Sequence, residues 1–405
     1  MSLIRQLHMR TFVITVVVLF GCALWSQPAA LQTIKAVDDG TGPYTTVANW
    51  PQIPRDPGFM QGSHAGCFAE TPDRIFVVAR GELKIPLDKL PGNKVPNNWN
   101  GSWGAFNLGG ANGEKPAPPP VNGQTSGRMH NAIVIVDSTG KVLEAWNQWD
   151  SLFVGSGHPE RSGRQFGPHS AVISPYDPER AVWVVDDAAQ QIFKFSNDGK
   201  KLLMTIGVKQ EAGTDPFHIG GATDIAWLPD GTFLISDGYD NSRVAKFDKN
   251  GKFLMSWGKA GRAPGEFNLP HSIAIDKNRR VYVADRGNNR IQVFDENGKP
   301  LEIWTGINQP SHIMITADQH LAVGTLRTNK MLKYDLTGKL VSAWGTSGNG
   351  PGQIDGIHGF CTDSNGVLMI SETFGGRIQR FTPKPGVDQN LLIGAPPPLM
   401  PKSGD

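Results

Sequence analysis

A unit of about forty residues recurs along most of the chain. Each copy opens with a short apolar run, crosses a tight turn and continues through further apolar runs, many of them separated by Asn-Gly or Asp-Gly. Clear copies occupy residues 168–207, 222–258, 270–304, 310–344 and 357–381, and a more divergent copy begins near His64. One unit of short strands cannot bury both of its faces, so neighbouring units must stack around an axis. The six copies predict an all-β fold, a six-bladed β-propeller of four-stranded repeats.

The repeats place the propeller within residues 31–385, and residues 386–405 follow as a C-terminal tail. We expect the segment from Gln32 to Trp50 to add an outer strand to the last blade and so close the ring. Residues 84–128 interrupt the first unit and are rich in Pro, Gly and Asn. This insertion is predicted to be a long exposed loop on one face, with a lid over the central funnel as the alternative.

The first thirty residues differ in character from the repeats. Arg5 and Arg10 precede an apolar run from Phe12 to Trp25, and small residues follow. This order is typical of a secretory signal, so residues 1–30 are predicted to be a signal peptide. The mature protein would then be exported to the periplasm or the extracellular space, with no membrane span. The alternatives are an uncleaved membrane anchor and a lipoprotein signal, in which Cys22 would carry the lipid.

Charge and cysteine content add two expectations. The formal net charge is +2, and basic and acidic residues are interspersed, so we expect no nucleic-acid partner. Composition gives no expectation of an oligomeric state. Beyond the N-terminal segment the cysteines are Cys67 and Cys361. In an oxidising compartment they could form a disulfide between the first and last blades, or they could remain two buried thiols.

Histidines recur at one position of the repeat. Alignment of the units by their first hairpin places His169, His271 and His358 at this position, in the second, fourth and sixth units. Because the innermost strands of a propeller line its axis, equivalent side chains from different blades should converge there. Three converging imidazoles predict a site for zinc or another borderline divalent metal. The alternative is that each ring only hydrogen-bonds a neighbouring loop.

Other units carry different residues at or near this position. Thr223 takes it in the third unit, and His64 lies at the corresponding start of the first. In the fifth unit Ser311 takes the position, and His312 comes one residue later. One step along a strand moves a side chain to the opposite face, so His312 is predicted not to be a ligand.

The repeats resemble NHL repeats, and the chain from His64 to Phe381 resembles the peptidyl-α-hydroxyglycine α-amidating lyases, which are six-bladed propellers of this type. The most specific stretches are residues 236–244, 265–274 and 283–292. The resemblance implies that His169, His271 and His358 hold zinc. It also implies that Tyr239 is the catalytic tyrosine and that Arg80 and Arg286 are active-site arginines.

The activity implied by this resemblance is a metal-dependent lyase that cleaves the N–C bond of a carbinolamide in a small-molecule or peptide substrate. Zinc would polarise the substrate hydroxyl, Tyr239 would accept its proton, and Arg80 or Arg286 would hold a carboxylate. The structural alternatives are that Tyr239 fills a turn and that Arg286 pairs with Asp285.

Two departures from the family pattern bear on this expectation. Gly359 stands where the family has an aspartate that helps to bind calcium, which places calcium in doubt, and the sequence carries no companion monooxygenase domain. The main alternative function is a non-catalytic NHL propeller that binds a protein, peptide or glycan. A hydrolase of the lactonase kind ranks third, because its metal site needs acidic residues at the axis.

Overall fold

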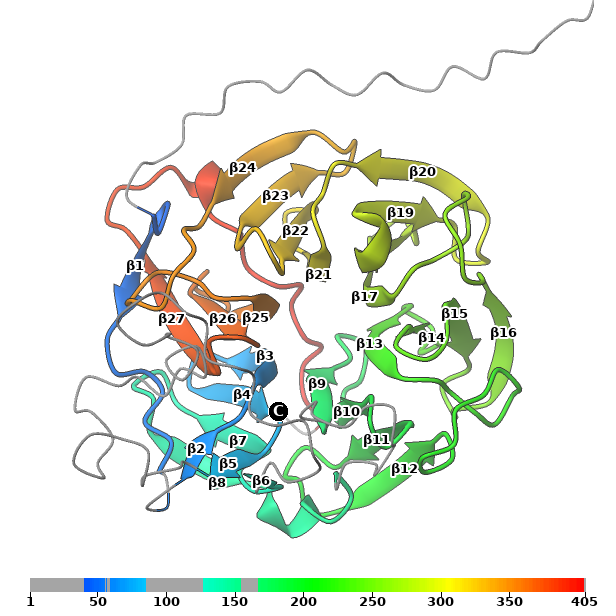
Figure 1. Cartoon of the computed structure of the whole chain (residues 1–405), viewed down its shortest axis with the longest axis horizontal. Helices are drawn as coiled ribbons and strands as arrows, with labels where there is room; N and C mark the ends of the chain where they lie inside the picture. The colour runs from blue at the N-terminus through cyan, green and yellow to red at the C-terminus, as the bar shows by residue number, and fades with distance from the viewer. Residues whose placement is uncertain (1–39, 55, 57–58, 85–126, 154–166, 404–405) are drawn as a thin grey trace, which may run out of the picture. The chain divides into compact units, whose positions relative to one another are not determined.

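The computed structural model describes residues 40–54, 56, 59–84, 127–153 and 167–403. Their strands form six four-stranded antiparallel sheets arranged around a central axis, with one smaller sheet beside them (Figure 1). This arrangement confirms the predicted six-bladed β-propeller. Within the same ranges no helix has the length and apolar character needed to cross a bilayer. The predicted signal peptide, including Cys22, lies outside the described residues.

The six blades follow one another along the chain. Blade one contains β3 (His64–Thr71), β4 (Arg74–Ala79), β7 (Ile133–Val136) and β8 (Val142–Ala145). Blade two contains β9 (Pro168–Ile173), β10 (Val182–Asp186), β11 (Gln191–Phe195) and β12 (Leu202–Ile206). Blade three contains β13 (Ala222–Trp227), β14 (Phe233–Asp237), β15 (Arg243–Phe247) and β16 (Phe253–Trp257).

The second half of the ring repeats this plan. Blade four contains β17 (Pro270–Ile275), β18 (Val281–Asp285), β19 (Arg290–Phe294) and β20 (Pro300–Thr305). Blade five contains β21 (Pro310–Ile315), β22 (His320–Thr325), β23 (Met331–Asp335) and β24 (Leu340–Trp344). Blade six contains β25 (Ile357–Thr362), β26 (Leu368–Glu372), β27 (Arg377–Pro383) and β1 (Tyr44–Val47).

The ring closes through β1. This strand pairs antiparallel with β27, with Tyr44 opposite Pro383 and Val47 opposite Arg380. The outer strand expected between Gln32 and Trp50 is therefore present. The Tyr44 ring packs on Trp344 of blade five, which joins the closing strand to the preceding blade.

Tryptophans at the ends of outer strands hold adjacent blades together. Trp257 of blade three lies against Gly298 of blade four, and Trp304 of blade four lies against Gly338 of blade five. Both glycines have positive φ, and a Cβ added at either would come within 3 Å of the indole. The Asn-Gly and Thr-Gly turns of the repeat thus leave room for the tryptophan of the preceding blade, and this explains their recurrence.

Cys67 of β3 and Cys361 of β25 form a disulfide between the first and last blades, with their Cα atoms 5.7 Å apart. A cross-link between residues so distant in sequence restricts the unfolded chain strongly.

We expect the double variant Cys67→Ser/Cys361→Ser to lose about 2–4 kcal/mol of unfolding free energy, because its unfolded chain is no longer restricted. The variant should still fold, because β1 closes the ring without the disulfide. Urea denaturation measures the loss. Wild-type protein in reducing agent should match the variant, and equal stability of oxidised wild type and variant would contradict the prediction.

A small sheet lies at the edges of the insertion in blade one. It consists of β2 (Phe59–Gln61), β5 (Glu82–Lys84) and β6 (Gly127–Arg128). The buried Glu82 carboxylate accepts hydrogen bonds from Arg128 and from Asn131 Nδ2. Both ends of the segment expected to be a loop are therefore paired as strands. Residues 85–126 lie outside the described residues, and the insertion leaves blade one directly after Arg80.

Candidate metal centre

A β-bulge in the first strand of every blade places one residue out of register. In β17, for example, Pro270 pairs with Asp285 and Ser272 with Ala284, so His271 is bulged. The bulged residues, here called the bulge ring, are Ala65, His169, Thr223, His271, Ser311 and His358. A bulge of this kind redirects a side chain and often occurs beside a functional site.

The ring agrees with the sequence alignment in five blades and differs in the first. Ala65 is the bulged residue there, whereas His64 pairs in register with Ala79. The placement of His64 at the equivalent position is therefore corrected by one residue. His312 lies one residue after Ser311 and outside the metal-ligand cluster, as the strand register predicts.

The three histidines of the bulge ring converge on the axis. Their candidate ligand atoms all lie within 4.8 Å of one another, and the Nε2 atoms of His169 and His271 are 3.3 Å apart. The ring centroids are separated by 4.6–4.9 Å. Each side chain is at least nine-tenths buried. This is the one cluster of potential metal ligands in the described part of the chain.

The hydrogen bonds of the other ring nitrogens fix the orientation of two imidazoles. His271 Nδ1 lies 2.5 Å from the Ser311 carbonyl oxygen, and His358 Nδ1 lies 2.8 Å from that of Ala65. Since a carbonyl oxygen can only accept, Nδ1 carries the proton and Nε2 keeps its lone pair. In both cases the carbonyl belongs to the bulge ring of the next blade. Two Nε2 lone pairs therefore face the axis, as metal ligation requires.

Electrostatics keeps these histidines uncharged. Burial lowers the pKa of His169 well below its usual value, and His358, Arg80 and Arg286 lower it further. Burial likewise lowers the pKa of His271 and of His358. Because a metal binds neutral imidazole, no proton has to be displaced at neutral pH. Three buried, neutral imidazoles whose nitrogens converge fit zinc or another borderline divalent ion.

Tyr239 lies against this cluster. Its hydroxyl is 3.0 Å from His271 Nε2 and 3.4 Å from His169 Nε2. The tyrosine belongs to the turn between β14 and β15, where Gly238 approaches Pro270 so closely that an added Cβ would lie 1.9 Å from its carbonyl oxygen. Only glycine fits at that point, and this glycine brings Tyr239 over the axis. Its hydroxyl therefore contacts the imidazole cluster.

The two predicted arginines stand at the same turn of their blades. Arg80 follows β4, and its Nη2 lies 3.4 Å from Asp187 Oδ2. Burial lowers the pKa of Arg80, but Asp187 and Tyr239 outweigh this effect, so the pKa is raised. Arg286 follows β18, with its guanidinium carbon 5.6 Å from the centre of the Tyr239 ring. Asp285 pairs with Arg290 at 2.7 Å, so the expected alternative of an Arg286–Asp285 pair is not formed.

Asp187, which pairs with Arg80, and the adjacent Asp186 are buried acids that the sequence reasoning missed. In blades three, four and six a buried acid at the end of the second strand pairs with an arginine that begins the third. In blade two Asp186 faces Gln191 instead, and its Oδ2 atom has no hydrogen-bond partner in the described residues. Burial and then the adjacent Asp187 raise the pKa of Asp186 to about 7. The replacement of arginine by glutamine in one repeat was the available signal.

Asp186 should make stability depend on pH. The pKa of its carboxyl in the folded protein, about 7, exceeds the ordinary aspartate pKa of 3.8, so folded protein binds more protons between these values and its stability falls as pH rises through them. Asp186→Asn is expected to stabilise the protein at about pH 8, by at most about 4 kcal/mol, and to have little effect near pH 4. Chemical denaturation at both pH values tests this.

The matched control for Asp186 is Asp285→Asn, which leaves the buried Arg290 without its carboxylate. This control should destabilise the protein at both pH values. An Asp186→Asn variant that is less stable than wild type at about pH 8 would show that the ionised carboxylate contributes favourably there.

Comparison with known proteins identifies the repeat. Residues 267–294, which include β17 to β19, match the family described as NHL repeat. The first three strands of blade four match an NHL repeat. The expected resemblance to NHL propellers is confirmed by this match and by the six-bladed ring.

Curated proteins that are similar to this chain include amidating enzymes. A Xenopus laevis protein named peptidyl-glycine alpha-amidating monooxygenase B is 36% identical over 173 residues, which cover 41% of this chain and 18% of that protein. A Caenorhabditis elegans protein named probable peptidyl-alpha-hydroxyglycine alpha-amidating lyase is 27% identical over 54% of this chain and 64% of its own length. The human NHL repeat-containing protein 3 is 31% identical over 49% of this chain and 56% of its own length. The matched region thus spans less than two thirds of each relative.

Proposed function

We propose that this propeller is a zinc-dependent lyase that cleaves the N–C bond of a carbinolamide, as in an α-hydroxyglycine derivative. The observation that carries the proposal is the approach of Tyr239 Oη to within 3.4 Å of two of three converging imidazoles. A general acid–base group beside a cluster of neutral metal ligands is the minimum that this reaction needs. Relatives named as amidating enzymes support the same reaction class.

The chemistry consists of one elimination. The substrate hydroxyl loses its proton, its oxygen forms a carbonyl, and the N–C bond breaks while the amide nitrogen gains a proton. The products are a primary amide and glyoxylate or a related aldehyde. His169, His271 and His358 would hold a zinc ion, which would supply Lewis-acid polarisation of the hydroxyl oxygen when bound.

The protein side chains would handle the proton and orient the substrate. Tyr239, in its deprotonated form, would accept the hydroxyl proton and return it to the leaving nitrogen, because its oxygen lies beside the imidazole nitrogens. Arg286, stacked over Tyr239, would hold the substrate carboxylate. Arg80, paired with Asp187, would position Tyr239 and add positive charge near the developing oxyanion.

The test uses protein comprising residues 31–405. We expect about one zinc per chain by elemental analysis, and release of equimolar glyoxylate and benzamide from α-hydroxyhippurate. A chelator should abolish the release, and added zinc should restore it. Zinc without turnover would exclude this substrate class, and absence of any metal would favour the alternative of a non-catalytic propeller that binds a protein, peptide or glycan.

The cellular setting that we propose agrees with this chemistry. Export by the segment 1–30 would place the Cys67–Cys361 disulfide in an oxidising compartment, periplasmic or extracellular. The bulge ring carries no carboxylate, so the acidic site of a lactonase-type hydrolase is not formed from it.

A further inference from the structure

A second ring is formed by the residues that come directly after each bulge-ring member in the first strand of the six blades. Its members are Gly66, Ser170, Asp224, Ser272, His312 and Gly359. Three of them, from adjacent blades, form one polar network. Ser272 Oγ lies 2.5 Å from Asp224 Oδ2 and 3.3 Å from His312 Nδ1. The network therefore connects blades three, four and five.

The proton positions in this network follow from counting donors. A serine hydroxyl has one proton, and the short contact assigns it to Asp224. Ser272 Oγ then accepts from the Ile313 amide, at 3.1 Å, and from His312 Nδ1. Burial lowers the pKa of His312, so the ring is neutral with its proton on Nδ1. Nε2 is left as an acceptor, and no described residue donates to it.

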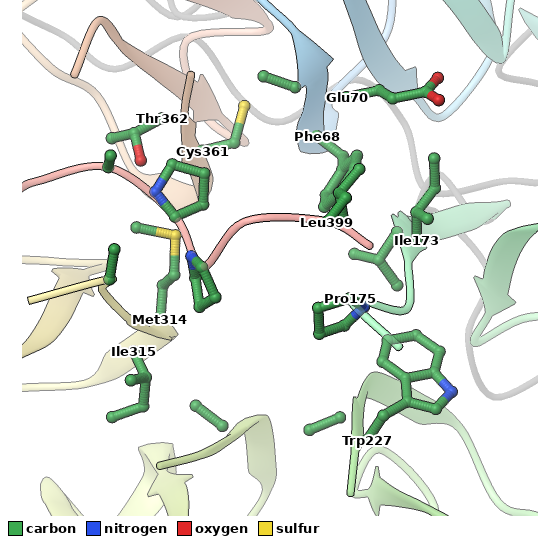
Figure 2. Close-up of a pocket in the computed structure, with 18 of the residues that line it drawn as sticks. Phe68, Glu70, Ile173, Pro175, Trp227, Met314, Ile315, Cys361, Thr362 and Leu399 are labelled. Carbon is green, nitrogen blue, oxygen red and sulfur yellow. The ribbon is translucent and has the colours of Figure 1, made fainter. Parts of the chain in front are cut away.

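His312 lines a cavity of about 640 Å³ whose wall includes the first strands of all six blades. None of the three bulge-ring histidines belongs to this wall, so the cavity is separate from the candidate metal centre. Its side chains are mainly apolar, and Figure 2 shows Phe68, Ile173, Trp227, Met314 and Ile315 around the open space. Both the volume and the apolar lining are typical of pockets for small molecules.

The C-terminal segment 394–403, here called the strap, crosses this cavity (Figure 2). Ala395 O accepts from the Ala317 amide of blade five, and the Met400 amide donates to Pro175 O of blade two. Pro396, Pro397 and Pro398 lie between these two bonds, and proline has no amide proton to donate. The strap is thus bonded at both ends and contributes an apolar surface between them, with Leu399 beside Phe68 and Ile173.

We propose that this cavity binds an uncharged apolar molecule with one hydroxyl group, which donates a hydrogen bond to His312 Nε2. The apolar walls and the strap enclose the body of the molecule, and Nε2 is the acceptor that fixes its polar end. A carboxylate is disfavoured because Asp224 Oδ2 lies 3.7 Å from His312 Nδ1 and, in the part of the chain that the structure describes, no residue near the acceptor offers a positive charge. Arg180, at the rim, is paired with Glu70 and with the Met400 carbonyl oxygen.

Three probes of similar size test the proposal, with binding measured by calorimetry. We expect 4-butylphenol to bind with one site per chain and about tenfold more tightly than 4-butylanisole, which has no donor. 4-Butylbenzoate should bind no better than the anisole. Equal affinity for phenol and anisole, or no binding of the phenol, would overturn the proposal.

Two variants locate the site. His312→Phe keeps an aromatic ring and removes the acceptor, so it should lose the preference for phenol over anisole. Met314→Trp fills the cavity and should weaken both ligands, whereas binding that is unchanged in this variant would place the site elsewhere. Zinc content should equal that of wild type in both variants. Since these readouts need no turnover, the failure of either proposal leaves the other intact.

Discussion

Replacing His271 by alanine is expected to remove the bound zinc and to lower the rate of glyoxylate release by about a thousandfold or more. His271 supplies one of three imidazole ligands, and two neutral ligands hold zinc too weakly to survive purification. Loss of Lewis-acid stabilisation costs several kcal/mol of transition-state energy, and about 4 kcal/mol corresponds to a factor of a thousand. Elemental analysis and a steady-state assay measure the two effects.

His320→Gln is the matched control for this variant. His320 begins β22, is partly exposed and pairs with Asp318, away from the bulge ring. It should retain zinc and full activity. If His271→Ala kept stoichiometric zinc, the three histidines would not be the ligands and the proposed activity would lose its basis.

Tyr239→Phe is expected to lower kcat by a factor of about 10²–10⁴ while zinc content and KM stay close to wild type. The phenol oxygen contacts His169 and His271 but belongs to a different turn, so its removal leaves the imidazole cluster in place. Steady-state kinetics with elemental analysis separates loss of chemistry from loss of metal.

Tyr334→Phe serves as the control for the tyrosine, because Tyr334 lies in the third strand of blade five and packs on Trp304. It should leave kcat unchanged. A Tyr239→Phe enzyme with wild-type kcat would assign the proton transfer to another group. A variant without zinc would instead show that Tyr239 acts on the cluster itself.

Much of the fold could be predicted because every repeat carries the same local signals. Apolar alternation, Asn-Gly turns and the hairpin length are properties of short segments, and six copies specify a closed ring. The position of His169, His271 and His358 followed from the same alignment. In the first blade this alignment is changed by a shift of one residue. A count back from Ala79 to the bulge identifies Ala65 rather than His64.

Contacts between blades could not be predicted in the same way. The Asp187–Arg80 pair and the Asp224–Ser272–His312 network depend on distances between units that the sequence does not encode locally. For the same reason, the sequence did not decide whether Cys67 and Cys361 form a disulfide, because a disulfide requires two Cβ atoms at a specific separation. The sequence of the strap gave no sign, apart from its prolines, that this segment crosses the cavity lined by His312.

The pairing of β1 with β27 has a consequence for the order of folding. Residues 44–47 are synthesised before the strands from β2 to β26, but their partner strand, residues 377–383, is synthesised after those strands. The closing strand therefore stays unpaired until β27 has been synthesised, while the intervening blades can already stack on one another. Such late, long-range closure slows folding and leaves an edge open to intermolecular association in the meantime.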